Sequence, residues 1–502
     1  MENRNLIISP DTGNRSFFSN YKEQAAAAAR EISSGPAVRS VVVIALSFLL
    51  TSTGWLSWEY HLMDQIPAGM SDMCTMVIGY LLQAAGIAAF AFICRRDPGR
   101  ISAVFSAALV LHMVCMVPAV ISPFTAGTLI FGFLMNYTCG IIAGYYLTDL
   151  TQSVPGDHRA SVFGLGYGLS ILMSWLFSRI GGGAIYYSEK VLLICLILTA
   201  AVFAVVSADG GKKPDTEHLP EAETLRGAET IPETNTAGRQ ARAGRSRSKY
   251  ANRSFLLLAG ALVLLFSLVN GSGFAFPAAD LGQSVNVELS RLFYAIGLIL
   301  AGIVTDTDRK HGAICALTAL IIPFIILALR GGSFSVVLFW ALSYFAFGFY
   351  AVYRVILFSD IAKESGMLFL SGMGLMTGRV GDAIGEGICL LLGNRLAAIV
   401  FLTTVMFCAA VAVFFRLYQV LYIPQGMREL TEKEKFSRFV AEHDLSPREQ
   451  DVMRLILENK TVSEIADTLS ISENTVKYHI RNILQKTGFH SRKELSSHYS
   501  ER

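Results

Sequence analysis

The residues from Ile471 to Lys486 include a set of polar side chains that could contact nucleic acid. Val476, Ile480 and Ile483 recur at helical spacing and predict one buried helix face. The opposite face carries basic, aromatic and amide side chains, namely Lys477, Tyr478, Arg481, Asn482, Gln485 and Lys486. Lysine and arginine can bind both phosphates and the edges of guanine. The stretch therefore predicts a basic amphipathic helix that contacts DNA.

A second set of charged residues lies inside the apolar run 366–392. Arg379, Asp382 and Glu386 are three and four residues apart, so they share one face of the predicted helix. The run is long enough to cross a lipid bilayer. Charges inside such a span are costly, and they face either a partner or a water-filled cavity. Two interpretations stay open: an Arg379–Asp382 pair that locks helix packing, and a ligand site. The third charge favours the ligand site, because a single structural pair does not explain it.

Other polar and aromatic groups could complete such a ligand site. They are Asn136 and Tyr137 in one apolar run, and Tyr344, Tyr350 and Arg354 in another. An aromatic pocket with few polar groups is typical of sites for small organic molecules. Taken singly, each of these residues is better explained as core or as lipid-facing surface. Glu59, at the end of the first apolar run, is expected in a solvated loop.

Two helix-capping signals precede the basic helix and place it in a larger motif. Ser446 and Glu449 form an S-x-x-E capping box with Pro447 in the first helical position, and Thr461 and Glu464 form a second box. Two short helices, a tight turn and a basic outer face match a helix-turn-helix whose recognition helix comes second. The alternative is a helical hairpin whose charges are only solvated. It is disfavoured because both capping boxes coincide with the buried face.

Four short motifs near the C-terminus point to one family. They are LSPRE at 445–449, EIA at 464–466, ISENTVKYHIRNIL at 471–484 and K-x-G-x-x-S-R at 486–492. On these motifs, the C-terminal stretch resembles the LuxR/FixJ-type helix-turn-helix transcriptional regulators, over about a tenth of the chain.

This resemblance implies roles for individual residues of the basic helix. Lys477, Tyr478 and Arg481 match family positions that face the major groove, and Thr475 and His479 match positions near phosphates. The implied partner is a double-stranded DNA operator. A homodimer on DNA is left open, because the fourth helix, a dimer contact in many relatives, is short and polar here.

The composition of the whole chain indicates a membrane protein. Of 502 residues, 53% are hydrophobic and only 16% are charged. A soluble protein carries about a quarter charged residues. The net charge of +3 is too small to argue from, and the eight cysteines occur singly, without a C-x-x-C motif. We therefore expect no disulfide framework, no metal site and no cofactor.

Twelve apolar runs account for the excess of hydrophobic residues, and most approach the roughly 20 residues needed to cross a bilayer. They lie at about 40–58, 73–94, 101–121, 126–147, 161–180, 190–207, 254–276, 289–305, 312–329, 334–354, 366–392 and 395–415. Basic residues concentrate in alternate connecting segments, with nine between 208 and 253. The positive-inside rule then places both termini in the cytoplasm. We expect a multi-pass protein of the bacterial cytoplasmic (inner) membrane, which is its lipid-bilayer partner.

The two halves of this membrane region carry repeated features. GYGL at 166–169 and GMGL at 372–375 occupy the fifth and eleventh runs, and the fourth and tenth runs lead to Asp149 and Asp360. Six plus six spans, a central inner linker and short basic loops resemble the major facilitator superfamily with its parallel halves. The loop DTDRKHG at 306–312 fits the family pattern only in part. The predicted fold class is all-α: two six-helix halves followed by a LuxR-type domain.

The predicted domains follow these boundaries: a cytoplasmic N-terminal segment 1–39, first membrane half 40–207, disordered cytoplasmic linker 208–253, second membrane half 254–415, connector helix 416–444 and DNA-binding domain 445–502. The sequence carries no nucleophile elbow, P-loop or HExxH motif, so we expect no enzyme. The favoured function is a membrane-bound transcription regulator whose membrane domain senses an unknown small molecule. The alternative is a secondary active transporter with an attached regulatory DNA-binding domain.

Overall fold

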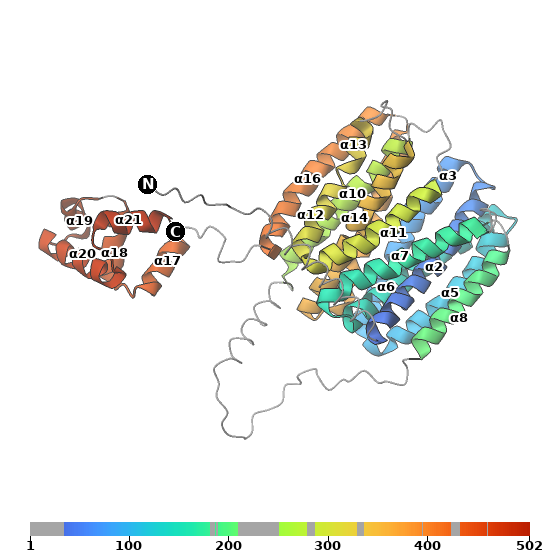
Figure 1. The fold of residues 1–502 in the computed structure, drawn as a ribbon, viewed down its shortest axis with the longest axis horizontal. Coiled ribbons are helices and arrows are strands. Elements are labelled where there is room, and N and C mark those ends of the chain that lie inside the picture. The colour runs from blue at the N-terminus through green and yellow to red at the C-terminus, as the bar shows by residue number, and fades with distance from the viewer. Residues whose placement is uncertain are drawn as a thin grey trace, which may run out of the picture. The chain divides into compact units, whose positions relative to one another are not determined.

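The computed structural model describes residues 35–180, 186, 189–208, 250, 252–278, 287–328, 336–393, 395–422, 432–458 and 460–501. The chain divides into two compact units, Met1–Tyr418 and Gln419–Arg502. Every regular element in the described residues is helical (Figure 1). The predicted N-terminal segment and central linker lie almost wholly outside these residues.

The first half of the membrane unit holds six spans joined by short turns. Its helices are α2 (Gly35–Met63), α3 (Ala68–Asp72) continued by a π-helical turn (Met73–Ile78) into α4 (Gly79–Arg96), α5 (Ile101–Ile121), α6 (Thr125–Ser153), α7 (Arg159–Ile180) and α8 (Lys190–Ser207). Single 3₁₀ turns at Pro98–Arg100 and Gly156–His158 precede α5 and α7.

The second half follows the same order. Its helices are α10 (Arg253–Ala278), α11 (Val287–Thr307), α12 (Arg309–Ala319), α13 (Ile322–Ala328), α14 (Val336–Ser365), α15 (Met373–Leu392) and α16 (Leu396–Tyr422). Within the described residues, nine helical segments are long and apolar enough to cross a membrane. The all-α, multi-pass prediction is therefore confirmed.

Two predicted spans are interrupted or begin later in the structure, and others are longer: α14 continues to Ser365, where the tenth run ended at 354, and α16 to Tyr422, where the twelfth ended at 415. The ninth run was expected as one helix over 312–329, but α12 ends at Ala319 and α13 begins at Ile322. Pro323 has no N–H to donate to a continuing helix and lies instead in the first turn of α13, where that donor is not needed. The eleventh run was expected from 366, but Gly366 adopts a left-handed conformation (φ 73°) that ends α14.

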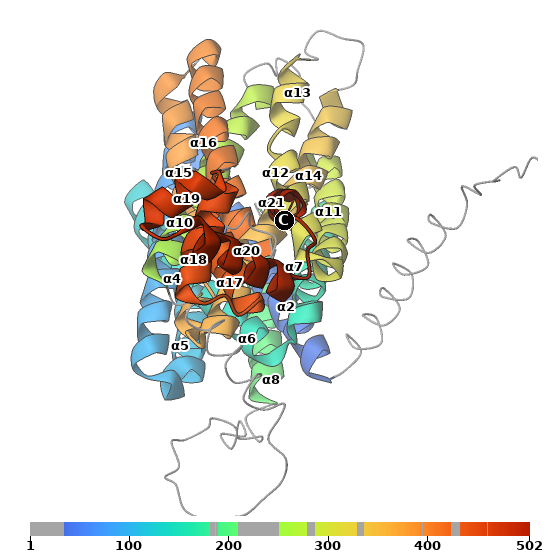
Figure 2. The same cartoon turned by 90° about the vertical axis from the view of Figure 1, so that its left-hand side faces the viewer.

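The two halves meet along two pairs of helices. α7 packs on α11, as both views show (Figures 1 and 2), and α4 packs on α15. The α7–α11 crossing is close: a Cβ added at Gly164 would lie 2.3 Å from the carbonyl oxygen of Leu298. Glycine is therefore required where these backbones touch.

The C-terminal unit is a small helical domain with its own core. Its helices are α17 (Glu432–Glu442), α18 (Pro447–Leu457), α19 (Val462–Leu469), α20 (Glu473–Thr487) and α21 (Arg492–Glu501). Both predicted capping boxes are present, at the starts of α18 and α19, and Ser472 caps α20. α21 is short, as predicted, and it buries Leu495 in the domain core. Residues 423–431 of the predicted connector lie outside the described part of the chain.

Candidate functional site

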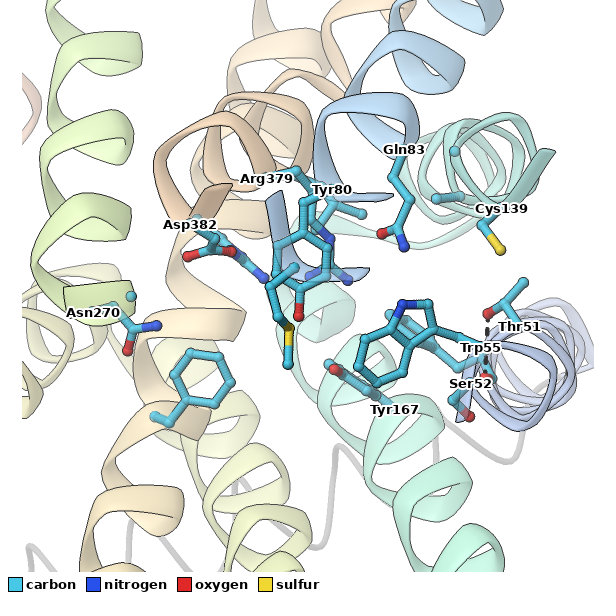
Figure 3. A pocket seen from close by; sticks show the side chains of 18 of the residues that line it. Thr51, Ser52, Trp55, Tyr80, Gln83, Cys139, Tyr167, Asn270, Arg379 and Asp382 are labelled. Carbon is cyan, nitrogen blue, oxygen red and sulfur yellow. Dashed lines mark hydrogen bonds and ion pairs between the residues drawn. The ribbon is translucent and has the colours of Figure 1, made fainter. Parts of the chain in front are cut away.

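The membrane unit encloses a cavity of about 540 Å³, and helices of both halves line it (Figure 3). Five of the predicted ligand residues line this cavity: Tyr344, Arg354, Arg379, Asp382 and Glu386. Side chains of α2, α4, α6 and α7 face them from the first half. Charged groups that are far apart in sequence therefore meet in one space.

The pairing of the deep charges differs from the sequence-based interpretation. Asp382 pairs with Arg354, Nη1 to Oδ2 at 2.9 Å, and not with Arg379. Arg354 also donates to the hydroxyl of Tyr350 at 2.9 Å, and its guanidinium lies 4.8 Å from the centre of that ring. Both members of the ion pair are nearly fully buried. Of the two interpretations left open, the Arg379–Asp382 pair is therefore not found among the described residues, because α14 brings a second arginine to the carboxylate.

Arg379 instead lies against an aromatic ring. Its guanidinium carbon is 4.3 Å from the centre of the Tyr80 ring, at the middle of the cavity (Figure 3). Its Nε is buried without a hydrogen-bond partner in the described residues, and so is Oδ1 of Asp382. Polar atoms that are buried without a partner are rare and call for an explanation. A hydrogen-bond acceptor on a ligand in the cavity would satisfy Nε of Arg379.

The cavity also contains charged residues that the sequence analysis did not assign to it. Glu59 lines it together with Glu386 and Arg291. Glu59 was expected in a solvated loop, but α2 continues as far as Met63 and carries Glu59 along its inner face. The only sequence signal that could have located it is weak, because beyond Trp58 just Tyr60 and Leu62 continue the apolar pattern.

Three predicted ligand residues are not among the residues that line the cavity. Asn136 is fully buried, accepts a hydrogen bond from Gln83 at 2.8 Å and donates to the carbonyl of Gly132. The Tyr137 backbone forms the surface on which α4 packs at Gly86. Tyr350 lies behind Arg354 and shares a hydrogen bond with Ser267. These residues support the walls, so their contribution to a ligand site would be indirect.

Small residues of α15 set the distance between the charged helices. An added Cβ at Gly374 would lie 1.9 Å from the Arg354 carbonyl oxygen, and one at Gly381 would lie 2.4 Å from Cβ of Ser267 in α10. Gly374 is followed by Gly378, and Gly381 by Gly385, a four-residue spacing of small side chains that lets helices pack closely. They let α14 and α15 approach closely enough for Arg354 to reach Asp382.

An inter-half network of four charged residues ties the halves together at one end of the bundle. Arg159 of α7 donates to Asp360 of α14 at 2.6 Å. Arg309 donates to both Asp360 and Asp306, each at 2.8 Å. The Asp306 carboxylate also accepts two backbone N–H groups at the start of α7. Arg309 is thus the cation that contacts both carboxylates of the network.

In the C-terminal unit, the predicted DNA-contacting residues share the outer side of α20. Lys477, Tyr478, Arg481 and Gln485 are exposed, with Tyr478 at 60%. Thr475, His479 and Asn482 are partly buried at the edges of this face. Lys477, Arg481 and Gln485 also line a groove of about 730 Å³ that continues to the start of α21. Lys477 also pairs with Glu473 one turn earlier at 3.7 Å, an exposed contact, and the arrangement matches a recognition helix that presents its side chains to a DNA groove.

Lys486 differs from the other predicted DNA contacts. Its Nζ donates to Oε2 of Glu449 at 2.7 Å and to the carbonyl oxygen of Asp444 at 2.9 Å. Burial alone would raise the pKa of the Glu449 carboxyl, but hydrogen bonds from Lys486 and from the backbone of Ser446 outweigh it and hold that pKa below its ordinary value. Lys486 therefore braces α20 against α18, which positions the recognition helix.

Comparisons with known proteins agree with this arrangement in the C-terminal unit. The family model "GerE: Bacterial regulatory proteins, luxR family" matches residues 443–499. The spore germination protein GerE of Bacillus subtilis (strain 168) is 44% identical over 62 residues, which are 12% of this chain and 81% of that protein. The nitrate/nitrite response regulator protein NarP of Escherichia coli (strain K12) is 43% identical over 67 residues, 12% of this chain and 30% of that protein. These similarities cover only the DNA-binding domain.

The membrane unit is similar to solved transporter structures. A mutant of the peptide transporter POT in complex with sulfate superposes with a TM-score of 0.51 at 13% identity, covering 76% of this chain and 94% of that one. A POT family transporter in complex with 5-aminolevulinic acid superposes with a TM-score of 0.52 at 12% identity, covering 76% and 96%. At this identity the similarity shows the fold alone. The predicted facilitator-like fold of the membrane region is confirmed.

Proposed function

Because this chain belongs, through its C-terminal domain, to the luxR family of bacterial regulatory proteins, we propose that it is a membrane-bound transcription regulator controlled by a small molecule. In this proposal the membrane domain binds the molecule, and the helix-turn-helix domain binds an operator. One observation carries the proposal: both halves of the membrane unit build a cavity lined by charged side chains, and among the described residues Nε of Arg379 and Oδ1 of Asp382 are buried there without hydrogen-bond partners.

The cavity walls suggest how binding would change the protein. A ligand can shift a conformational equilibrium only if it binds one state better than the other. A molecule that touches α2 and α4 on one side and α14 and α15 on the other would favour the state in which both walls are within reach. Transporter-type folds supply such states by moving one half against the other. The membrane domain would then act as a two-state sensor.

The DNA-binding part of the proposal rests on the exposed basic face of α20. Lys477 and Arg481 would contact bases or phosphates, so operator binding should weaken as salt rises. The proposal includes both termini in the cytoplasm, where DNA is accessible, and it assigns no catalytic activity. A homodimer on DNA fits the proposal but is not required by it.

The test uses the full-length protein in lipid nanodiscs. An operator is first selected from random DNA duplexes, and a library of small molecules is then screened for compounds that change operator affinity. Arg379→Gln should abolish the effect of such a compound and leave operator affinity without the compound unchanged. A compound that acts equally on the wild type and on the isolated C-terminal unit would contradict a sensor role for the membrane domain.

The transporter fold supports a second candidate function, a secondary active transporter with an attached DNA-binding domain. Proteoliposomes separate the two functions. Uptake of the active compound by liposomes that contain the protein would favour the transporter. A compound that changes operator affinity but does not accumulate would favour the sensor.

A further inference from the structure

The charges at the bottom of the cavity do not balance. Arg354 and Asp382 neutralise each other through their 2.9 Å ion pair. Arg379 adds a second guanidinium beside them without an ion pair among the described residues. One positive charge is therefore left over among these three groups, and no ion pair with Glu59 or Glu386 balances it in the described residues. Such a charge is costly unless an anion accompanies it.

The position of Arg379 leaves its donors available for an anion. The Tyr80 ring stabilises the guanidinium by a cation–π contact at 4.3 Å, and this contact supplies no oxygen acceptor. Nε of Arg379 has no partner in the part of the chain that the structure describes. A planar guanidinium with free N–H groups matches the two oxygens of a carboxylate. Arg354 is less suited to this role, because its Nη1 already donates to Asp382 and Tyr350 and Asp382 neutralises its charge, although its Nε also has no partner among the described residues.

The walls around Arg379 are largely aromatic. Trp55 and Tyr80 lie nearly parallel with ring centres 6.5 Å apart, and Trp340 and Tyr344 lie 5.9 Å apart. Tyr167 stacks on Phe48 at 3.8 Å. All of these rings line the cavity, whose volume of about 540 Å³ suits a molecule the size of a small drug or metabolite. Such walls favour a ligand with a flat aromatic ring over a branched or strongly hydrated ligand.

The remaining charges restrict the ligand further. The carboxylates of Glu59 and Glu386 also line the cavity, with Arg291. A ligand with several negative charges would be repelled by these carboxylates, whereas a single carboxylate can lie on Arg379. A neutral aromatic molecule would leave the Arg379 charge unbalanced.

From these observations we propose that the cavity takes a small aromatic monocarboxylate, with its carboxylate on Arg379 and its ring among Trp55, Tyr80 and Tyr167. This inference rests on the proposed function in one respect, namely that the membrane domain binds a small molecule. It adds the chemical class of that molecule and the residue that selects it.

The test compares three probes on the full-length wild-type protein in nanodiscs. Equilibrium dialysis measures the binding of 3-phenylpropionate, of its neutral amide and of 3-cyclohexylpropionate. The acid should bind roughly tenfold to a hundredfold more tightly than the amide, as expected for a charge-assisted hydrogen bond. It should also bind more tightly than the cyclohexyl acid. Failure of 3-phenylpropionate to bind at millimolar concentration, or equal binding of the amide, overturns the proposal. Equal binding of the cyclohexyl acid overturns the assignment of an aromatic ring.

Three variants test the residue. Arg379→Gln should lose the preference for the acid over the amide, and Arg379→Lys should keep part of it. Arg95→Gln is the matched control, because Arg95 also lies over a ring, that of Phe369 at 5.3 Å, but does not line the cavity. Its preference should equal that of the wild type. An Arg379→Gln protein that elutes as a monodisperse species and keeps the preference would contradict the role of Arg379.

The outcome for the ligand class is separate from the outcome for the proposed function. Binding of the acid without any change in operator affinity would support the aromatic-acid site and contradict the sensor. A change in operator affinity caused by a non-acidic compound, together with no binding of the acid, would support the sensor and contradict the aromatic-acid site.

Discussion

Arg481 is exposed on the outer side of α20, and this position allows its guanidinium to contact DNA directly. Arg481→Ala should weaken operator binding by about 1–3 kcal/mol if the arginine reads a base. Arg438→Ala removes the same charge from the exposed surface of α17 and should weaken binding less. Fluorescence anisotropy with a labelled operator measures both. Equal losses would mean that Arg481 contributes only general charge.

Lys486 and Glu449 have a different part in the same domain, because their contact lies between helices. Glu449→Gln should lower the stability of the C-terminal unit by about 1–3 kcal/mol at neutral pH. The folded-state pKa of Glu449 is below its ordinary value of 4.5, so the stabilisation is present above that pH and is lost as the pH falls through the lower, folded-state pKa. Urea unfolding at a series of pH values measures this. The variant should lose that part of the pH dependence, and a variant as pH-sensitive as the wild type would contradict the assignment.

At the scale of the elements, the contact between α14 and α15 depends on one glycine. A Cβ at Gly374 would collide with the Arg354 carbonyl oxygen in the helix backbone, which cannot move aside cheaply. Gly374→Ala should therefore destabilise the membrane unit by about 1–3 kcal/mol. Gly260→Ala is the control, because nothing lies within 4 Å of an added Cβ in α10. Thermal unfolding of the detergent-purified protein should show a lower midpoint only for Gly374→Ala.

Helix caps and apolar runs were predictable because they depend on residues close together in sequence. Ser446 with Glu449 and Thr461 with Glu464 cap the predicted helices, and the spans over 101–121 and 190–207 begin and end where expected. Partners across helices were not predictable in this way. The spacing of three between Arg379 and Asp382 suggested a pair, but the crossing of α14 and α15 decides which arginine reaches the carboxylate.

The cavity was predictable only in part for a related reason. Arg379, Asp382 and Glu386 were found because charges in an apolar run are conspicuous. Tyr80 and Gln83 also line the cavity, but the sequence did not predict this. A polar or aromatic residue in a span looks the same in sequence whether it faces a cavity or a neighbouring helix. Asn136 is the opposite case: it was predicted as a ligand residue, but its amide is hydrogen-bonded to Gln83 and to the Gly132 carbonyl of its own helix, so it does not line the cavity.

At the scale of the whole molecule, the distribution of basic residues predicts the orientation in the membrane. Both termini and residues 208–253 should be cytoplasmic, because the inner segments hold most of the lysines and arginines. Alkaline phosphatase fused after Arg502 should be inactive, and green fluorescent protein at the same position should fluoresce. The opposite pattern would place the DNA-binding domain outside the cell and contradict the proposed function.

The inter-half network should contribute to the stability of the membrane unit as a whole. Asp360→Asn removes the charge shared by Arg159 and Arg309 and leaves Arg159, which is 1% exposed, without its ion-pair partner. The expected loss is on the order of 1–3 kcal/mol, because Asp360 itself is partly exposed. Asp97→Asn is the control, since its pair with Arg100 is largely exposed and should contribute almost nothing. Thermal unfolding midpoints compare the two variants.

For a regulator that works as proposed, the same four charges would set its dose–response curve. Any state in which the halves separate at that end must first break the Arg159–Asp360 ion pair and the two hydrogen bonds that Asp306 accepts from the start of α7, so the ligand has to supply that free energy. Each weakened contact would move the half-maximal response to a lower ligand concentration, by about tenfold for every 1.4 kcal/mol removed. Relatives could therefore differ in sensitivity to one compound without any change in the residues that touch it.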